Sequence, residues 1–256
     1  MAKSRFEYVK HFEILDECLR NCWIVVRVDG KNFHKFSVAH NFKKPNDDNA
    51  LDLMNESACG VMRLFHDIIL AYGASDEYSF VFKKATKTYN RRASKLSSTV
   101  VSQFSSSYTF HWTKYFPNQK LLYPPVFDSR VVLYPSDMNM RDYLSWRQAD
   151  CHINNLFNTC FWNLVHDGMT TKQAEASLKG TNSSEKNELL FSKFRTNYND
   201  LPQVYRKGTI ILRKKGCADY SKKDELFQPN SNSRFEVLHE DIIGQDFWTE
   251  HADLLT

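Results

Sequence analysis

Two aspartates at the ends of predicted strands are the residues in this chain most suited to chemistry. Asp29 follows an apolar run at 23–28, and Asp76 lies in a short turn between the runs 68–72 and 77–82. If the runs are neighbouring strands, both carboxylates lie at one edge of a sheet and repel each other unless cations lie between them. Mg²⁺ prefers such oxygen ligands, and a pair of these ions supports phosphoryl transfer. Alternatively, both aspartates serve only turns, where Asp and Gly are common.

Only one of the adjacent acidic residues Asp76 and Glu77 is expected to bind metal. Successive side chains on a strand point to opposite faces of the sheet. We assign the metal-binding role to Asp76.

A basic segment leads into a predicted helix. Every charged residue between 83 and 95 is Lys or Arg. Arg92 and Lys95 are three residues apart and therefore share a helix face. Such a face suits triphosphate oxygens, which Arg binds through two hydrogen bonds and Lys as a point charge. The alternative is a solvated face with no ligand.

The segment HINNLFNT at 152–159 places several polar side chains inside a predicted helix. Asn is a poor helix former because its amide competes with the backbone, so this composition indicates another use. His152, Asn155 and Thr159 fall on one face. Two interpretations stay open: a functional surface, or a buried hydrogen-bond network between helices.

The pattern of apolar residues predicts the elements that position these side chains. In the first half we expect helices at 3–20, 49–66 and 89–115 and strands at 23–28, 68–72, 77–82 and 130–134. This order predicts an α+β fold with a ferredoxin-like split βαβ core and an antiparallel sheet. In the second half we expect helices at 137–167, 170–178, 184–193 and 241–254, a strand at 209–213 and a loop at 215–238.

Two parts follow from this pattern: a catalytic core with an amino-terminal helix at 1–135, and a helical portion with one late strand at 136–256. We expect the second part to pack on the first as a single compact unit.

The composition is that of a globular protein without a membrane anchor. The chain has 256 residues, 42% hydrophobic and 25% charged, and its net charge of +4 is too small to name a partner. The six cysteines form no CxxC pair and no apolar signal segment opens the chain, so we expect reduced thiols and a cytoplasmic or nuclear location, with a mitochondrial one left open. No pattern supports a Ser-His-Asp triad, a Walker phosphate loop or a dinucleotide fingerprint.

Several long motifs together resemble the eukaryotic tRNA-histidine guanylyltransferase family. They are VVRVDGKNFHKFS at 25–37, KPND at 44–47, YGASDEYSFVF at 72–82, RRASK at 91–95, LSWRQADCHINNLFNT at 144–159 and EKNELLF at 185–191. The resemblance covers about 1–212, whereas 215–240 has no counterpart. One departure is Phe157, where the family usually has Tyr.

The resemblance implies a polymerase-like palm and a reaction in the 3′–5′ direction. A guanosine is added to the 5′ end of tRNA-His after ATP adenylylates the 5′-monophosphate. The 3′-hydroxyl of GTP then attacks the activated phosphate, AMP leaves, and pyrophosphate is finally removed. The resemblance also implies a homotetramer built as a dimer of dimers.

The resemblance also implies roles for individual residues. Two Mg²⁺ ions would be bound by Asp29, Asp76 and the backbone carbonyl of Gly30. The nucleotide site would contain these three residues together with Lys31, Asn32, Phe33, His34, Asp47, Ser75, Arg92 and Lys95. Within it, the loop 31–34 would surround the triphosphate, and His34 and Asp47 would lie near the guanine. Ser75, Arg92 and Lys95 would contact phosphates. His152, Asn155 and Lys186 would serve the RNA or the activated 5′ end.

Two other functions fit the same residues. A templated 3′–5′ polymerase could repair truncated tRNA 5′ ends, or the palm could be a catalytically idle RNA-binding protein. The intact Asp29 and Asp76 argue against the idle protein. No motif specifies how tRNA-His is distinguished from other tRNAs.

Overall fold

A six-stranded antiparallel sheet forms the centre of the molecule in the part of the chain that the computed structural model describes, residues 4–214 and 234–255. Its strands are β1 (Trp23–Gly30), β2 (Ile68–Ala74), β3 (Glu77–Phe82), β4 (Phe127–Tyr134), β5 (Thr209–Arg213) and β6 (Phe235–Leu238). The order is β4-β1-β3-β2-β5-β6. The first four strands have the ferredoxin-like order, so the predicted α+β fold with a split βαβ core is confirmed.

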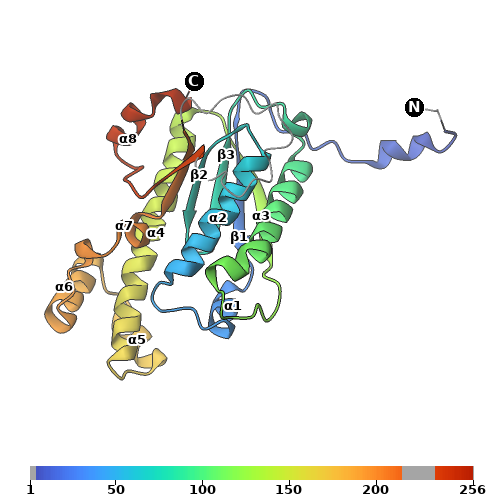
Figure 1. Cartoon of the computed structure of the whole chain (residues 1–256). Helices are drawn as coiled ribbons and strands as arrows, with labels where there is room; N and C mark the ends of the chain where they lie inside the picture. Colours follow the sequence, from blue (N-terminus) through green and yellow to red (C-terminus); the bar gives the residue numbers. More distant parts are fainter. Residues whose placement is uncertain (1–3, 215–233, 256) are drawn as a thin grey trace.

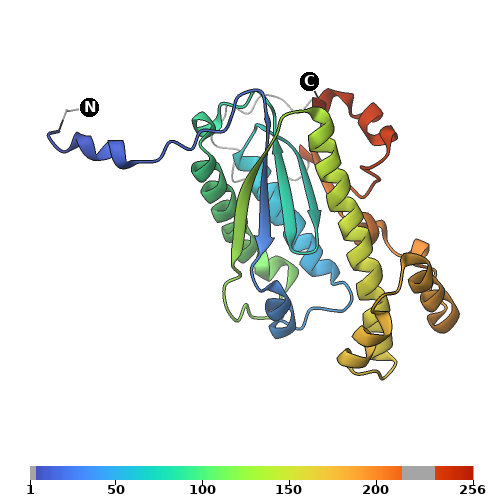
Figure 2. The same cartoon turned by 180° about the vertical axis from the view of Figure 1, so that it is seen from behind.

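Helices cover both faces of this sheet. The α-helices of the described residues are α1 (Phe33–Ala39), α2 (Asp48–Leu64), α3 (Ala93–Tyr115), α4 (Asp137–His166), α5 (Thr171–Leu178), α6 (Ser183–Phe194), α7 (Gln203–Lys207) and α8 (Gln245–Glu250). Helices α2 and α3 lie over one face, and α4 crosses the other (Figures 1 and 2). Short 3-10 helices occupy Glu7–Phe12, Thr88–Arg91, Tyr198–Asp200 and Ala252–Leu255.

The continuous apolar run of β1 reflects burial on both faces. Ile24, Val26 and Val28 pack in the core beneath α2 and α3. Trp23 and Val25 point the other way and pack with residues of α4 and the carboxyl-terminal segment. Because alternate side chains of a strand face opposite sides, a strand covered on both sides is apolar at nearly every position.

The carboxyl-terminal half of α4 leaves the sheet and supports a separate helical cluster. Leu156, Cys160 and Leu164 of α4 pack with buried residues of α5 and α6. Figure 2 shows these helices gathered beyond the lower end of the sheet. Across the described residues, none of the helices combines the length and apolar character needed to span a membrane.

The predicted helix at 3–20 is wrong. This segment contains only the 3-10 helix Glu7–Phe12, none of whose residues is buried. Figure 1 shows the segment extending away from the body of the chain. A short amphipathic helix depends on packing of its apolar face for stability, and in the part of the chain that the structure describes Glu7–Phe12 has no such packing.

Smaller differences concern short helices and the ends of predicted elements. Helices α1 and α7 were not predicted, and α3 begins at Ala93 rather than at 89. The predicted loop 215–238 ends in strand β6, while its residues 215–233 lie outside the described ones. The predicted helix 241–254 is shorter and consists of α8 followed by a 3-10 turn.

Candidate active site

Asp29 and Asp76 lie beside each other at one end of the sheet. Strand pairing places Asp29 opposite Glu77, and the Gly30 N–H donates to the backbone carbonyl of Asp76 at 3.1 Å. A methyl group added to Gly30 would lie 2.9 Å from Asp76 Oδ2 and 2.6 Å from the Phe33 ring. Glycine at position 30 therefore gives the Asp76 carboxylate its place next to the end of β1.

The electrostatic environment of Asp76 suits a bound cation. Burial raises the pKa of the Asp76 carboxyl, and the negative charge of Asp29 raises it further. The Ser75 hydroxyl, which donates to Asp76 Oδ1 at 3.1 Å, acts in the opposite direction. Two carboxylates that disfavour each other's charge, with backbone carbonyls nearby, form a set of hard oxygen donors that fits Mg²⁺.

Glu77 belongs to a different set of contacts from Asp76. Arg147 on α4 donates through Nη1 to both oxygens of Glu77, at 3.2 and 3.1 Å. Arg27 Nε lies 3.6 Å from Glu77 Oε2. Glu77 therefore joins the sheet to α4, while Asp76 lies against Gly30.

Lys44 is a residue of this site to which the sequence reasoning gave no role. Its ammonium donates to Ser37 Oγ at 2.8 Å. Burial lowers the pKa of Lys44, and the nearby charges of Asp47 and Asp76 oppose that change. The signal was the KPND motif, whose first residue brings a positive charge between two carboxylates.

The Asp47 carboxylate is held in one orientation by the backbone. As the N-cap of α2 it accepts from the Ala50 N–H at 3.1 Å, and its other oxygen accepts from the Lys43 N–H at 2.8 Å. Its predicted contact with guanine stays a prediction, and it would use the lone pairs that these bonds leave.

The loop from Lys31 to His34 directly follows the carboxylate edge. Lys31 and Asn32 are exposed, and Asn32 adopts a left-handed conformation (φ 56°) that turns the chain into α1. Phe33 is buried against Gly30, whereas His34 is exposed. The structure therefore brings this predicted nucleotide loop next to Asp29 and Asp76.

Arg92 and Lys95 are not brought to that edge. They begin α3 beside residues that precede β1: the Ala93 N–H donates to the Asp16 carbonyl at 2.9 Å, and Arg92 Nε lies 3.9 Å from Asp16 Oδ1. The Lys95 ammonium lies over the Tyr89 ring, 4.6 Å from its centroid. Both side chains are exposed, and their predicted contact with phosphates stays a prediction.

The HINNLFNT face contains the buried hydrogen-bond network that was one of its two interpretations. Asn155 donates to Asn46 Oδ1 at 3.1 Å and accepts from the Tyr198 hydroxyl at 3.2 Å. The Thr159 hydroxyl donates to the Asn155 carbonyl at 2.7 Å. The network links α4 to the loop that carries Lys44 and Asp47.

His152 and Lys186 lie at the edges of this region. The His152 ring is half-buried against Tyr198, with 5.4 Å between ring centroids, and burial lowers its pKa. Lys186 on α6 donates to the Thr181 carbonyl at 2.6 Å. Phe157, which departs from the family pattern, stacks on Phe161 with 6.2 Å between centroids.

Comparisons with known proteins agree over nearly the whole chain. The family described as tRNAHis guanylyltransferase matches residues 6–135, and the Thg1 C terminal domain matches residues 138–255. A probable tRNA(His) guanylyltransferase of Drosophila melanogaster is 57% identical, over 100% of this chain and 86% of that protein. The tRNA(His) guanylyltransferase of Schizosaccharomyces pombe is 53% identical, over 99% of this chain and 98% of that protein.

Solved structures give the same result. The crystal structure of tRNA(His) guanylyltransferase from Saccharomyces cerevisiae superimposes with a TM-score of 0.78 at 46% identity, covering 86% of this chain and 100% of that one. A bacterial Thg1-like protein in complex with ATP has a TM-score of 0.75 at 22% identity, over 97% of this chain and 96% of that one, which supports the fold alone. The chain belongs to the tRNA(His) guanylyltransferase family of nucleotidyltransferases.

Proposed function

We propose that this protein adds a guanosine to the 5′ end of tRNA-His. The observation that carries the proposal is the convergence of Asp29 and Asp76 around Gly30 in a chain that aligns over its whole length with proteins named tRNA(His) guanylyltransferase. Phosphoryl transfer depends mainly on positioning and charge stabilisation. A site built from carboxylates and lysines, without a protein nucleophile, suits that chemistry.

The proposed reaction has three steps and runs in the 3′–5′ direction. The 5′-monophosphate of the tRNA attacks the α-phosphorus of ATP, which releases pyrophosphate and leaves an adenylylated 5′ end. The 3′-hydroxyl of GTP then attacks the activated tRNA phosphate, and AMP leaves. Water finally cleaves the triphosphate of the added nucleotide, releasing pyrophosphate and leaving a 5′-monophosphate.

Asp29, Asp76 and the Gly30 carbonyl would hold two Mg²⁺ ions. Bound there, the ions would neutralise phosphate charge and favour ionisation of the attacking hydroxyl. Lys44, whose pKa is influenced by the charges of Asp47 and Asp76, would add positive charge to the site.

The remaining residues would bind and orient the substrates. Asp47, fixed by two backbone N–H groups, would accept from N1–H and the 2-amino group of guanine, with His34 nearby. The loop from Lys31 to Phe33 and the Ser75 hydroxyl would surround the triphosphate. In the proposal His152, Asn155 and Lys186 serve the RNA or the activated 5′ end, and Arg92 and Lys95 bind phosphates.

We also propose that the functional unit is a homotetramer. Large apolar side chains of the amino-terminal segment are exposed, among them Phe12 at 79% and Leu15 at 97%. An assembly would bury them. It would also bring Arg92 and Lys95 of one copy within reach of an RNA bound to another. Sedimentation of the full chain and of a chain lacking residues 1–20 tests this, because equal masses per particle would reject the role of the segment.

A 5′-end extension assay tests the proposed reaction. Monophosphorylated tRNA-His lacking its extra guanosine is incubated with ATP, labelled GTP and Mg²⁺, beside an Asp76→Ala control. We expect one guanosine to be added to tRNA-His, none to another tRNA, and none by the control. Multiple additions, or addition to 5′-shortened tRNAs, would indicate the repair polymerase instead. GTP that binds, seen as a rise in melting temperature, without addition would reject the reaction.

A further inference from the structure

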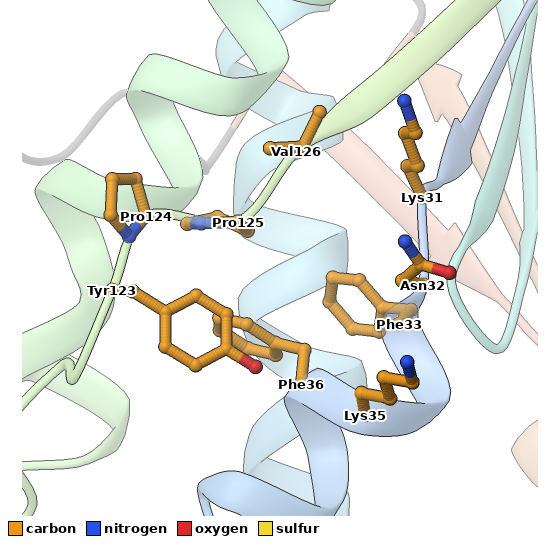
Figure 3. A pocket seen from close by; sticks show the side chains of 9 residues that line it. All are labelled: Lys31, Asn32, Phe33, Lys35, Phe36, Tyr123, Pro124, Pro125 and Val126. Carbon is orange, nitrogen blue, oxygen red and sulfur yellow. The ribbon is translucent and has the colours of Figure 1, made fainter.

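A hollow lies beside the carboxylate edge, between the start of α1 and the segment that leads into β4. Its volume is about 340 Å³, and it is lined by Lys31, Asn32, Phe33, Lys35, Phe36, Tyr123, Pro124, Pro125 and Val126. Figure 3 shows the aromatic rings between the two walls. The Lys31 N–H donates to the Val126 carbonyl at 2.8 Å and fixes one wall to the other.

The floor and one side of the hollow form an aromatic platform. Phe33 and Phe36 stack with 4.9 Å between centroids, and Tyr123 meets Phe36 edge-on at 5.5 Å. Phe33 and Phe36 are buried, but 43% of Tyr123 is exposed. Tyr123 therefore presents a ring face or edge to a ligand while its neighbours hold it in place.

Buried His40 keeps this platform rigid. His40 Nε2 accepts from the Leu122 N–H at 3.0 Å, and His40 Nδ1 donates to the Phe36 carbonyl at 2.9 Å. The Gln119 side-chain amide donates to the His40 carbonyl. The segment before β4 is thus tied to α1 on both sides of Tyr123 and offers a preformed site.

Both charged residues that line the hollow are lysines. Lys31 and Lys35 extend from the α1 wall (Figure 3), and both are exposed. The sequence has no acidic residue between Asp29 and Asp47, and none between Glu77 and Asp128. An exposed aromatic ring beside lysines is the combination with which proteins bind single-stranded nucleic acid: the ring stacks on a base and the lysines contact the backbone.

We infer that this hollow binds an unpaired base at the 3′ end of the RNA substrate. The inference rests on the proposed function, because an RNA whose 5′ end lies at Asp29 and Asp76 brings its own 3′ strand alongside. Lys31 follows Asp29 by two residues, so the hollow lies within reach of that strand. The base stacks on Tyr123, and the adjoining phosphates lie near Lys31 and Lys35.

Affinity measurements with two RNAs test this inference. One is tRNA-His with its unpaired 3′-terminal nucleotides, and the other is the same RNA with those nucleotides removed. Both are titrated with the full-length protein, without ATP, and binding is followed by fluorescence anisotropy. We expect Tyr123→Ala to weaken binding of the intact RNA by about tenfold, the lower range of one lost base–aromatic stack. Its affinity for the shortened RNA should stay unchanged.

Tyr123→Phe is the matched control because it keeps the ring, and it should bind both RNAs like the unmodified protein. Equal loss on both RNAs, or no loss on either, would overturn the inference. If Tyr123→Ala instead weakens only GTP or ATP binding, the hollow holds the base of a free nucleotide. Should Tyr123→Ala unfold, Lys35→Glu gives the same comparison.

The result is separable from the proposed reaction, since binding is measured without chemistry. Discrimination between the two RNAs with no guanosine addition would reject the reaction and keep the base site. Addition that proceeds without such discrimination would reject only the base site.

Discussion

The adjacent carboxylates of Asp76 and Glu77 should respond to neutralisation with stability changes of opposite sign. Asp76 lies against Gly30 near the charge of Asp29, whereas Glu77 binds Arg147 and Arg27. Asp76→Asn and Glu77→Gln each remove one negative charge with almost no change of shape. The pair therefore separates a carboxylate kept for a ligand from one that stabilises the fold.

Asp76→Asn should stabilise the protein in the absence of divalent cations. A carboxyl whose pKa is raised in the folded state makes folding less favourable at pH values above that pKa, because the unfolded chain ionises more easily. Each unit of such a shift corresponds to about 1.4 kcal/mol. The gain in free energy of unfolding should be largest at neutral pH. It should vanish as the pH falls to the ordinary pKa of an Asp carboxyl. Turnover should fall by at least ~10²-fold.

Glu77→Gln should destabilise the protein at neutral pH. Burial raises the pKa of Glu77, and the charges of Arg147 and Arg27 oppose that rise. Taken alone, this direction favours a neutral side chain at position 77 as it does at position 76. The contacts decide the sign, because both Glu77 oxygens accept from the buried Arg147 guanidinium. The loss arises because Arg147, 9% exposed, keeps only Asp150, at 3.5 Å, as its partner in an ion pair. Removing one partner of a buried pair costs about 3 kcal/mol, or roughly 6–12 °C in melting temperature for a chain of this length.

The stability of both variants is measured by thermal unfolding in the presence of a chelator, at neutral and at acidic pH. Their activity is measured as single-turnover rates at temperatures well below the unfolding transition. A lower melting temperature for Asp76→Asn at neutral pH, or an unchanged one for Glu77→Gln, would refute this reasoning. The Glu77→Gln rate should exceed that of Asp76→Asn, because Glu77 acts through the position of α4.

Three further substitutions test buried polar contacts by chemical denaturation. Tyr108→Phe should leave the free energy of unfolding equal or raise it by up to ~1 kcal/mol, because the Tyr108 hydroxyl is buried without a hydrogen-bond partner among the described residues. Tyr143→Phe is its contrast and should lose ~1 kcal/mol or more, since that hydroxyl bonds Ser79 Oγ at 2.6 Å; equal effects would contradict both. Glu56→Gln should cost about 3 kcal/mol, because it removes the 4%-exposed carboxylate that the 16%-exposed Arg63 side chain contacts at 3.1 Å; a loss below ~0.5 kcal/mol would contradict this.

The sheet could be predicted because its local patterns and its packing agree. The run at 23–28 is apolar at nearly every position because both faces of β1 are covered. The turn at Ser75 and Asp76 that joins β2 to β3 is so short that it allows only an antiparallel hairpin. The meeting of Asp29 and Asp76 also requires β1 to pair with β3, which the split βαβ order predicts.

The amino-terminal helix and the position of Arg92 and Lys95 could not be predicted because they depend on distant partners. Periodicity at 3–20 indicates that a helix could form, but among the described residues nothing buries Glu7–Phe12. Spacing predicts that Arg92 and Lys95 share a helix face, but Arg92 is the extended N-cap residue that precedes α3. Spacing also does not show toward which end of the sheet the two side chains lie. That end depends on contacts with Asp16 and Glu17, which precede β1.

The HINNLFNT segment shows why its two interpretations need not exclude each other. The Asn155 amide is buried and bonded to Asn46 and Tyr198, so in this conformation its proposed service to the RNA is to position neighbouring groups. Asn46 lies between Lys44 and Asp47 in the sequence, and the charge of Lys44 acts on Asp76. A network that fixes α4 therefore also fixes the nucleotide side of the site. In the proposed reaction, RNA would bind along α4 and a nucleotide beside Asp47. The buried hydrogen bond between Asn155 and Asn46 would then fix the position of one relative to the other.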